Sequence, residues 1–306
     1  MSRTSNRGSS RTQKFGNRDT AKKQSVVVKY LTAYLRVMSK QPFHLSYVDA
    51  FAGCGARIDA AESEKQQPGF MFDAPASEPK VGTALEALRL KPGFDRYVFG
   101  DLNGRHLTAL ADRIAELRAS GEDLPVPHLL RADANELVRQ ECEWLDGHGM
   151  RKAVMFLDPY GMQVEWRTLQ TIAECRKIDL WLLLPTGIAI NRLVPRRGGQ
   201  QPRWAERLDA FYGTPDWRSA FLTVDRDMLG VERQARSLDL NGIVRFTMER
   251  LITLFGGGLY PAALPLRTGR HQSYHLVFAN SSKQEHVWDR AHRIAGHLIK
   301  KAQAGS

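Results

Sequence analysis

The stretch Tyr47-Val48-Asp49-Ala50-Phe51-Ala52-Gly53-Cys54-Gly55 decides the fold of this 306-residue chain. An apolar strand predicted at 45–49 ends at Asp49, and a turn of small residues follows it. Gly53 and Gly55 would let the backbone approach a ligand that a Cβ atom would block. The turn lacks the third glycine of GxGxxG and the lysine of a P-loop, which disfavours a phosphate cradle. It suits a ligand with an amino acid moiety, because Asp49 can pair with an ammonium and the turn can accommodate a carboxylate.

Short apolar strands and helices alternate outward from this turn. We predict strands at 45–49, 97–101, 126–130, 153–157 and 178–184, and helices at 24–39, 82–90, 104–118, 135–146 and 165–175. This alternation predicts a parallel sheet with helices on both faces. Two strands joined by a turn, at 260–266 and 274–279, follow a helix at 241–255 and precede one at 284–300. We therefore expect an α/β, Rossmann-like class I methyltransferase sheet, mostly parallel with an antiparallel last strand.

Acidic residues also follow the next two predicted strands. Asp101 is followed by Leu102, and Asp133 by Ala134. Ligands of open α/β sheets bind at the carboxyl ends of the strands, where an acidic residue often holds ribose hydroxyls. We expect Asp101 to hold a ribose and Asp133 to bind an adenine amino group, although each could simply cap the helix that follows it. The predicted cofactor-binding residues are Asp49, Phe51, Gly53, Gly55, Asp101, Leu102, Asp133 and Ala134.

The strand at 153–157 leads into Asp158-Pro159-Tyr160-Gly161. In amino-methylating enzymes a similar cluster accepts hydrogen bonds from an NH₂ group while its aromatic ring stacks on the base. Methyl transfer from a sulfonium depends mostly on proximity and orientation, so little acid–base chemistry is required of the protein. We predict Asp158, Pro159 and Tyr160 as the catalytic residues. The alternative is a strand–helix turn in which the Asp caps a helix and the Tyr packs.

Taken together, the segments YVDAFAGCG, VFGD, ADAN, FLDPYG and SYHLVFANSS resemble the bacterial three-Cys-motif partner proteins, a branch of the class I methyltransferase fold. The resemblance runs from about Lys29 to Leu298. It implies S-adenosylmethionine as the cofactor and a radical S-adenosylmethionine protein with a three-cysteine motif as a partner. The amino-methyltransferase motif has two prolines before its aromatic residue, whereas Tyr160 follows Pro159 directly. This departure weakens the expectation of an exocyclic base amine as the methyl acceptor.

The chain is basic, with a formal net charge of +11 and a pI near 9.7. Much of this charge lies near the N-terminus, where residues 1–20 are rich in Ser, Asn and Gly and are predicted to form a flexible arm. A second basic cluster lies in a predicted helical insertion at about 190–240 and comprises Arg192, Arg196, Arg197, Arg203 and Arg207. Aromatic residues are interleaved with these charges: Trp204, Phe211, Tyr212 and Trp217. We expect the arm and the insertion to bind phosphates and stack bases, with a solvated, solubilising tail as the alternative.

The rest of the sequence is that of one domain at 21–306. Residues 56–81 form a long irregular segment beside the glycine turn, interpreted as a lid or as disorder. The three cysteines form no CxxC pair, and His271 and His275 have no second ligand cluster, so we predict neither a disulfide framework nor a metal site. No apolar run has transmembrane length and no signal peptide is evident, so we expect a cytoplasmic protein.

These observations predict methyl transfer from S-adenosylmethionine to a nucleic acid. Two other functions are consistent with part of these observations. The chain could be a cofactor-binding partner subunit of the three-Cys-motif radical protein, without catalysis of its own. It could also be a nucleic-acid-binding module, which would bind with a steep salt dependence and would show no cofactor affinity.

Overall fold

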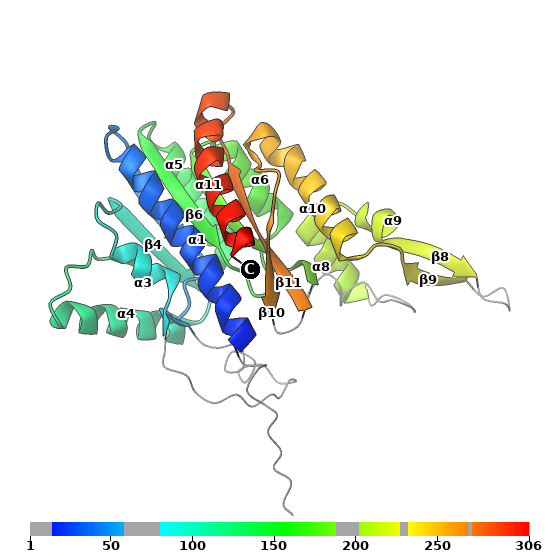
Figure 1. The fold of residues 1–306 in the computed structure, drawn as a ribbon, viewed down its shortest axis with the longest axis horizontal. Helices are drawn as coiled ribbons and strands as arrows, with labels where there is room; N and C mark the ends of the chain where they lie inside the picture. Colours follow the sequence, from blue (N-terminus) through cyan, green and yellow to red (C-terminus); the bar gives the residue numbers. More distant parts are fainter. Residues whose placement is uncertain (1–13, 58–79, 188–201, 227–231, 269–270, 306) are drawn as a thin grey trace, which may run out of the picture.

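A seven-stranded sheet forms the centre of the molecule (Figure 1). The computed structural model describes residues 14–57, 80–187, 202–226, 232–268 and 271–305. In chain order, the strands of the sheet are β1 (His44–Asp49), β4 (Arg96–Asp101), β5 (His128–Arg131), β6 (Arg151–Leu157), β7 (Ile178–Leu184), β10 (Leu264–Thr268) and β11 (His271–Asn280). In space their order is β10-β11-β7-β6-β1-β4-β5.

Strand direction confirms the predicted sheet. Neighbouring strands from β7 to β5 run parallel, whereas β11 is antiparallel to both β7 and β10. A plain dinucleotide-binding sheet has six parallel strands in the order 3-2-1-4-5-6. Here the last strand is reversed and lies between the fifth and sixth strands of that order. The fold is therefore α/β and methyltransferase-like, with a mostly parallel sheet.

Helices cover both faces of the sheet, as predicted. The α1 layer packs on one apolar core and comprises α1 (Lys14–Met38), α3 (Thr83–Leu88), α4 (Gly104–Ala119) and α11 (Glu285–Ala304). The α5 layer packs on the other core and comprises α5 (Ala134–Asp146), α6 (Trp166–Cys175), α8 (Pro202–Tyr212), α9 (Trp217–Phe221) and α10 (Leu240–Phe255). Among the described helices, none combines the length and apolarity needed to cross a membrane.

Helix α1 is longer than predicted, because it begins at Lys14. The predicted flexible arm at 1–20 is therefore wrong for residues 14–20, which belong to this helix, and its remaining residues 1–13 lie outside the described residues. The polar contacts that hold this helix include those of Tyr30 and Asp19. The Tyr30 hydroxyl donates to Asp179 Oδ2 on β7 over 2.5 Å, and the Arg267 amide on β10 donates to Asp19 Oδ2 over 2.6 Å. Asn280 Nδ2 also donates to Asp179, whose burial raises its pKa to about 6.

The insertion is not wholly helical. It contains α8 and α9, but also a hairpin of β8 (Leu222–Arg226) and β9 (Glu232–Arg236). Tyr212, Trp217 and Phe221 are fully buried, and the rings of Tyr212 and Phe221 pack against Phe246 of α10 with centroids 5.2 and 5.0 Å apart. The expectation that Phe211, Tyr212 and Trp217 stack bases is therefore wrong, because these side chains form the core that attaches the insertion.

Candidate functional site

The glycine turn after β1 has the backbone that the sequence predicted. Gly53 and Gly55 both have positive φ, at +62° and +70°. A Cβ atom at Gly55 would lie 2.5 Å from Leu110 Cδ1, so a larger residue here would have to displace this leucine of α4. A Cβ atom at Gly53 would meet nothing within 4 Å, so here the turn borders open space among the described residues. Gly53 thus leaves the backbone accessible to a ligand, whereas Gly55 fixes the turn on α4.

Asp49 lies at the end of β1 and is almost fully buried. Its Oδ1 accepts a hydrogen bond from the amide of Phe51 over 3.1 Å, while the half-buried Phe51 ring packs against the core of the α5 layer. Burial raises the pKa of Asp49 to about 7. The Phe51 hydrogen bond and Lys23 oppose this rise, whereas Asp158 and Asp101 add to it. A cationic group placed beside Asp49 would therefore favour its ionised form.

Asp158 follows β6 and forms an ion pair with Lys23 of α1. The pair is largely buried, with side-chain exposures of 14% for Lys23 and 26% for Asp158. Lys23 Nζ also lies 6.0 Å from the centre of the Phe156 ring. Lys23 binds Oδ2 of Asp158, and among the described residues no hydrogen bond to Oδ1 is found. The carboxylate is thus held on one side and free on the other.

Lys23 was missed by the sequence reasoning, although a signal was present. Lys23 is followed at i+4 and i+7 by Val27 and Tyr30, both of which are buried against the sheet. A lysine on the apolar face of a helix places its charge where it needs a partner. The partner is 135 residues away in sequence, so its identity needed the structure.

Pro159 and Tyr160 differ sharply in exposure. Pro159 is buried, whereas the Tyr160 side chain is 57% exposed and makes no ring contact with another described residue. The Tyr160 amide donates to Gln163 Oε1 over 2.8 Å, and Gly161 follows with a φ of +78°. The loop therefore has a fixed backbone and presents a free aromatic ring.

Asp101 ends β4 and organises its own turn. Its Oδ1 accepts a hydrogen bond from the Asn103 amide over 2.7 Å, and its Oδ2 lies 3.0 Å from His106 Nδ1. The next residue, Leu102, is 64% exposed. His106 was not predicted, and its Nε2 is buried without a hydrogen-bond partner among the described residues. A histidine five residues after the acidic residue, in the first turn of α4, was the available signal.

Asp133 caps α5, which was the alternative interpretation from the sequence. Its Oδ1 accepts hydrogen bonds from the amides of Asn135 and Glu136, at 2.9 and 3.4 Å. Asp133 itself is exposed, whereas Ala134 is buried. The prediction that Asp133 contacts an adenine stays a prediction beside this capping role.

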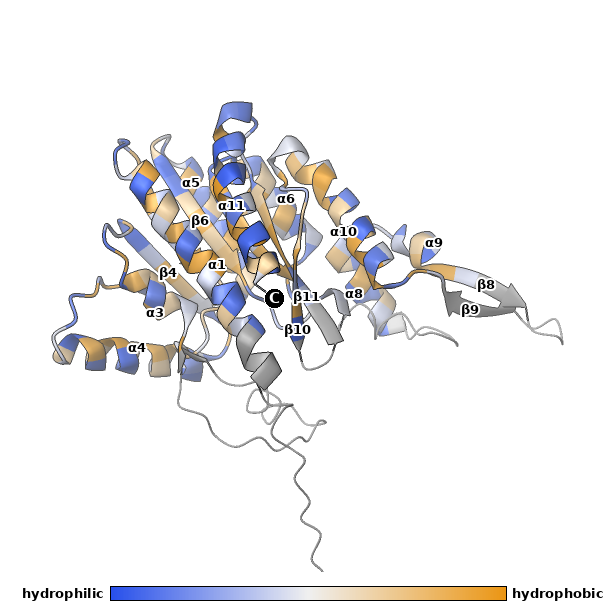
Figure 2. Cartoon of the chain, in the orientation of Figure 1, coloured by the Kyte–Doolittle hydropathy of each residue, from blue (hydrophilic) through white to orange (hydrophobic). Residues whose placement is uncertain are grey.

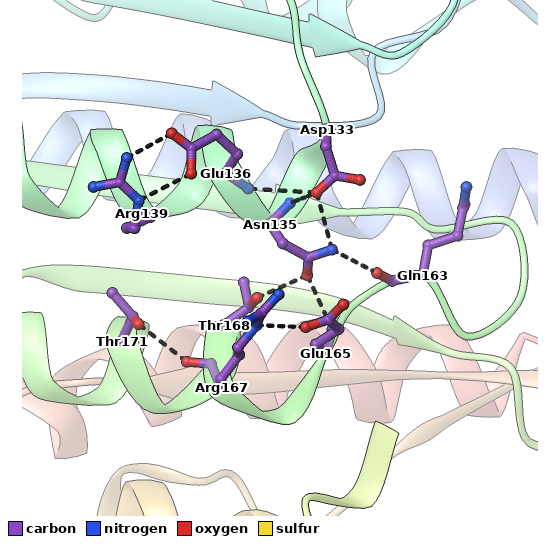
Figure 3. Close-up of polar contacts among 9 residues, drawn as sticks. All are labelled: Asp133, Asn135, Glu136, Arg139, Gln163, Glu165, Arg167, Thr168 and Thr171. Atoms are coloured by element: carbon purple, nitrogen blue, oxygen red, sulfur yellow. Dashed lines mark hydrogen bonds and ion pairs between the residues drawn. The ribbon is translucent and has the colours of Figure 1, made fainter. Parts of the chain in front are cut away.

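Asn135 joins three segments at this end of the sheet (Figure 3). Its Nδ2 donates to Asp133 and to the carbonyl of Gln163, and its Oδ1 accepts from the Glu165 amide and the Thr168 hydroxyl over 3.0 and 2.7 Å. These bonds tie the start of α5 to the loop after β6 and to the start of α6. Asn135 therefore positions the loop that carries Asp158 and Tyr160.

The acidic side chains fall into two groups. Asp49, Asp101 and Asp158 are close enough for the other two to raise the pKa of Asp49, with Lys23 among them. These four residues form the Asp49 cluster. It lies where β4 continues the sheet on one side of β1 and β6 lies on the other, which is the switch point where open α/β sheets bind ligands. Asp133 belongs instead to the Asn135 network.

The predicted basic cluster is described only in part. Arg203 and Arg207 are exposed on α8, whereas Arg192, Arg196 and Arg197 lie outside the described residues, as does most of the predicted lid.

His275 is buried, and its Nδ1 lies 2.6 Å from the Thr186 hydroxyl. Burial lowers the pKa of His275 to about 4, so this imidazole is neutral at physiological pH.

Comparisons with known proteins add little to this geometry. No family model matches the chain, and no curated protein matches it. Among solved structures, it is similar to protein LPL1258 of Legionella pneumophila, from the family DUF519, with 13% identity, a TM-score of 0.39, and 88% of this chain and 98% of that chain covered. It is also similar to the Escherichia coli "putative methyltransferase yhhF", with 10% identity, a TM-score of 0.28, and coverages of 68% and 84%. At these TM-scores neither likeness carries an argument about function.

Proposed function

We propose that this protein transfers a methyl group from S-adenosylmethionine to a nucleic acid. The observation that carries the proposal is the Asp49 cluster at the switch point of a methyltransferase-like sheet. The cluster places the carboxylates of Asp49, Asp101 and Asp158 and the ammonium of Lys23 beside the glycine turn that follows β1. This combination suits a ligand with an ammonium at one end and hydroxyl groups further along.

The described residues fit this cofactor. Asp49 would pair with the ammonium of its methionine part, and the open side of Gly53 leaves room for the carboxylate. Asp101 would accept hydrogen bonds from the ribose, beside the exposed side chain of Leu102, which offers an apolar surface to a base. When bound, S-adenosylmethionine supplies an electrophilic methyl group on a sulfonium. Because Asp49 has a pKa of about 7, pairing with an ammonium would release a proton near neutral pH.

The acceptor would bind at the loop after β6. Oδ1 of Asp158 is available to accept a hydrogen bond from an acceptor N–H, while Lys23 holds Oδ2 and thereby fixes the orientation of the carboxylate. The exposed ring of Tyr160 is available to stack on a base, a contact worth about 1–3 kcal/mol. These residues position the acceptor, which is the main requirement for an in-line methyl transfer.

The resemblance to three-Cys-motif partner proteins extends the proposal to a radical protein as partner. In that case the chain would bind the cofactor but would need the partner for turnover. The exposed Arg203 and Arg207 on α8 are further candidates for phosphate contacts.

Calorimetry with S-adenosylmethionine and S-adenosylhomocysteine tests the cofactor site. We expect micromolar binding to the wild type, loss of binding in Asp49→Ala, and unchanged binding in Asp123→Ala, which removes an exposed aspartate before β5 at the opposite end of the strands. Transfer of a labelled methyl group to RNA and DNA then tests the reaction. Asp158→Ala and Tyr160→Ala should lower the transfer rate more than they lower cofactor affinity.

Each alternative predicts a different result. Cofactor binding without transfer to any nucleic acid would favour the partner subunit, and addition of the radical protein should then restore turnover. Nucleic-acid binding without cofactor affinity would favour the binding module. Equal cofactor affinity in the wild type and Asp49→Ala would contradict the proposed site.

A further inference from the structure

The outward side of α1 carries a row of cations. Lys22, Lys29 and Arg36 are seven residues apart, a spacing that places them on one side of a helix, and Lys29 and Arg36 are exposed. The opposite side of the helix, with Val27 and Tyr30, is buried on the sheet. From Lys22 to Arg36 the row is about 21 Å long at 1.5 Å per residue. The one acidic residue of α1, Asp19, is bonded to the amide of Arg267.

Helix α11 lies against α1 and adds a second row (Figure 1). Its exposed cations recur at helical spacing and are Arg290, Arg293, Lys300 and Lys301. Figure 2 shows hydrophilic residues along the outward side of α11. The two rows together form the α1–α11 surface, defined by Lys22, Lys29, Arg36, Arg290, Arg293, Lys300 and Lys301.

Most cations of this surface form no ion pair within the part of the chain that the structure describes. Lys29, Arg36, Arg290, Lys300 and Lys301 form no ion pair with another residue in the described part of the chain, whereas Arg293 pairs with Asp289. An ordinary solvated helix gains stability from acidic residues three or four positions away from its cations. On α1 and α11 that pairing is largely missing among the described residues.

Helix α5 shows the ordinary pattern. Its exposed Arg139 pairs with Glu136 and Glu143, three and four residues away. The exposed cation of α5 is therefore paired on its own helix, whereas most of those on α1 and α11 are not. General solubility does not require this difference, since net charge of either sign on both layers would supply it.

We propose that the α1–α11 surface binds the sugar–phosphate backbone of a nucleic acid and leads it to the Asp49 cluster. The inference rests on the proposed function for the identity of the acceptor, but it concerns binding and not methyl transfer. The geometric link is α1 itself, because the helix whose outward side carries the cations also places Lys23 on Asp158. Cations spaced along one helix can contact successive phosphates and release their counterions.

The test is binding of a 20-nucleotide RNA and the matching DNA duplex to cofactor-free protein over a range of salt concentrations. The surface variant combines Lys29→Gln, Arg290→Gln and Lys300→Gln. The control variant removes the same charge from the α5 layer through Arg139→Gln, Arg167→Gln and Arg245→Gln, all at exposed positions. A plot of log K against log salt concentration has a negative slope. We expect the magnitude of this slope to decrease by about 2–3 in the surface variant and by less than about 1 in the control. Affinity in the surface variant should fall at least about tenfold at low salt.

Three outcomes separate this inference from the proposed function. If wild type and surface variant bind equally, or if both variants lose affinity equally, the surface is not the binding site, although a nucleic acid can still be the acceptor. If the wild type binds neither RNA nor DNA, the surface and the acceptor class are both wrong. If the surface variant alone loses binding while no methyl transfer is found, the surface stands and the enzymatic proposal fails. Circular dichroism of each variant reports whether it is folded.

Discussion

The two sides of the carboxyl edge of the sheet use the same sequence pattern differently. Asp49 follows β1 and is buried, and Asp158 follows β6 and is half-buried. Both lie near Lys23 of α1. At the end of β5, Asp133 is exposed and caps α5. In each case an aspartate follows a strand, but only the first two are buried or half-buried beside Lys23, whereas the third accepts hydrogen bonds from the amides at the start of α5. Burial, and not the position of the acid in the sequence, separates the proposed binding groups from the cap.

The largest effect should come from Asp49→Ala on cofactor affinity. Removal of a buried carboxylate that faces an ammonium should cost about 3 kcal/mol, or roughly 100-fold in Kd. Calorimetry with S-adenosylhomocysteine measures this change. An affinity within a factor of about three of the wild type would mean that Asp49 is only part of the turn.

Asp49 also predicts a pH dependence of stability. Its pKa is raised to about 7 in the folded protein, so the folded state holds this proton more tightly than the unfolded chain, where the carboxyl has an ordinary pKa near 3.8. The contribution of this group to stability should therefore be fully present below about pH 4 and should be lost as pH rises towards 7, at up to about 1.4 kcal/mol per pH unit.

Asp49→Asn isolates this contribution, because the amide keeps an oxygen for the Phe51 amide but carries no charge. In urea unfolding, the variant should become more stable relative to the wild type as pH rises from 5 to 8. A stability difference that stays constant over this range would show that Asp49 is not protonated in the folded protein near neutral pH.

Asp101→Ala should have an intermediate effect. The carboxylate would hold ribose hydroxyls, and its removal should weaken cofactor binding by roughly 1–3 kcal/mol. The matched variant His106→Gln removes only the imidazole that shares Asp101 Oδ2. If cofactor affinity falls equally in both variants, the effect comes from the turn and not from direct contact with ribose.

Asp133→Ala should have the smallest effect on the cofactor and a separate effect on folding. Loss of the cap should lower the free energy of unfolding by about 1 kcal/mol. Asp133→Ser, which can still cap, should restore most of this stability. A clear loss of cofactor affinity in the serine variant would instead support the predicted adenine contact.

Much of the fold could be predicted from local patterns, because buried strands such as 178–184 are continuous apolar runs. The antiparallel last strand followed from two strands joined by a turn. The insertion was harder, since aromatic residues between charges fit a base-stacking surface as well as a small core. Phe221 and Phe246, which bury Tyr212, are 9 and 34 residues away from it in sequence.

The site could be predicted only where its residues follow strands. Asp49, Asp101 and Asp158 follow three strands of one sheet, and the rule for parallel sheets brings them to one edge. Lys23 reaches that edge from a helix, and Asn135 bonds to residues some 30 positions away, so both depend on tertiary packing.

The contacts of α1 have a consequence for how the chain folds during synthesis. This helix leaves the ribosome before the strands on which it packs, since Tyr30 bonds to Asp179 and Asp19 to the amide of Arg267, partners that are 149 and 248 residues further along. Contacts of such long sequence separation form slowly. The nascent chain must therefore keep an amphipathic helix with an exposed apolar side until almost the whole sheet has been made. Docking of that helix on the sheet should be a late step. Because the helix carries Lys23, the Asp49 cluster should be complete only after this docking.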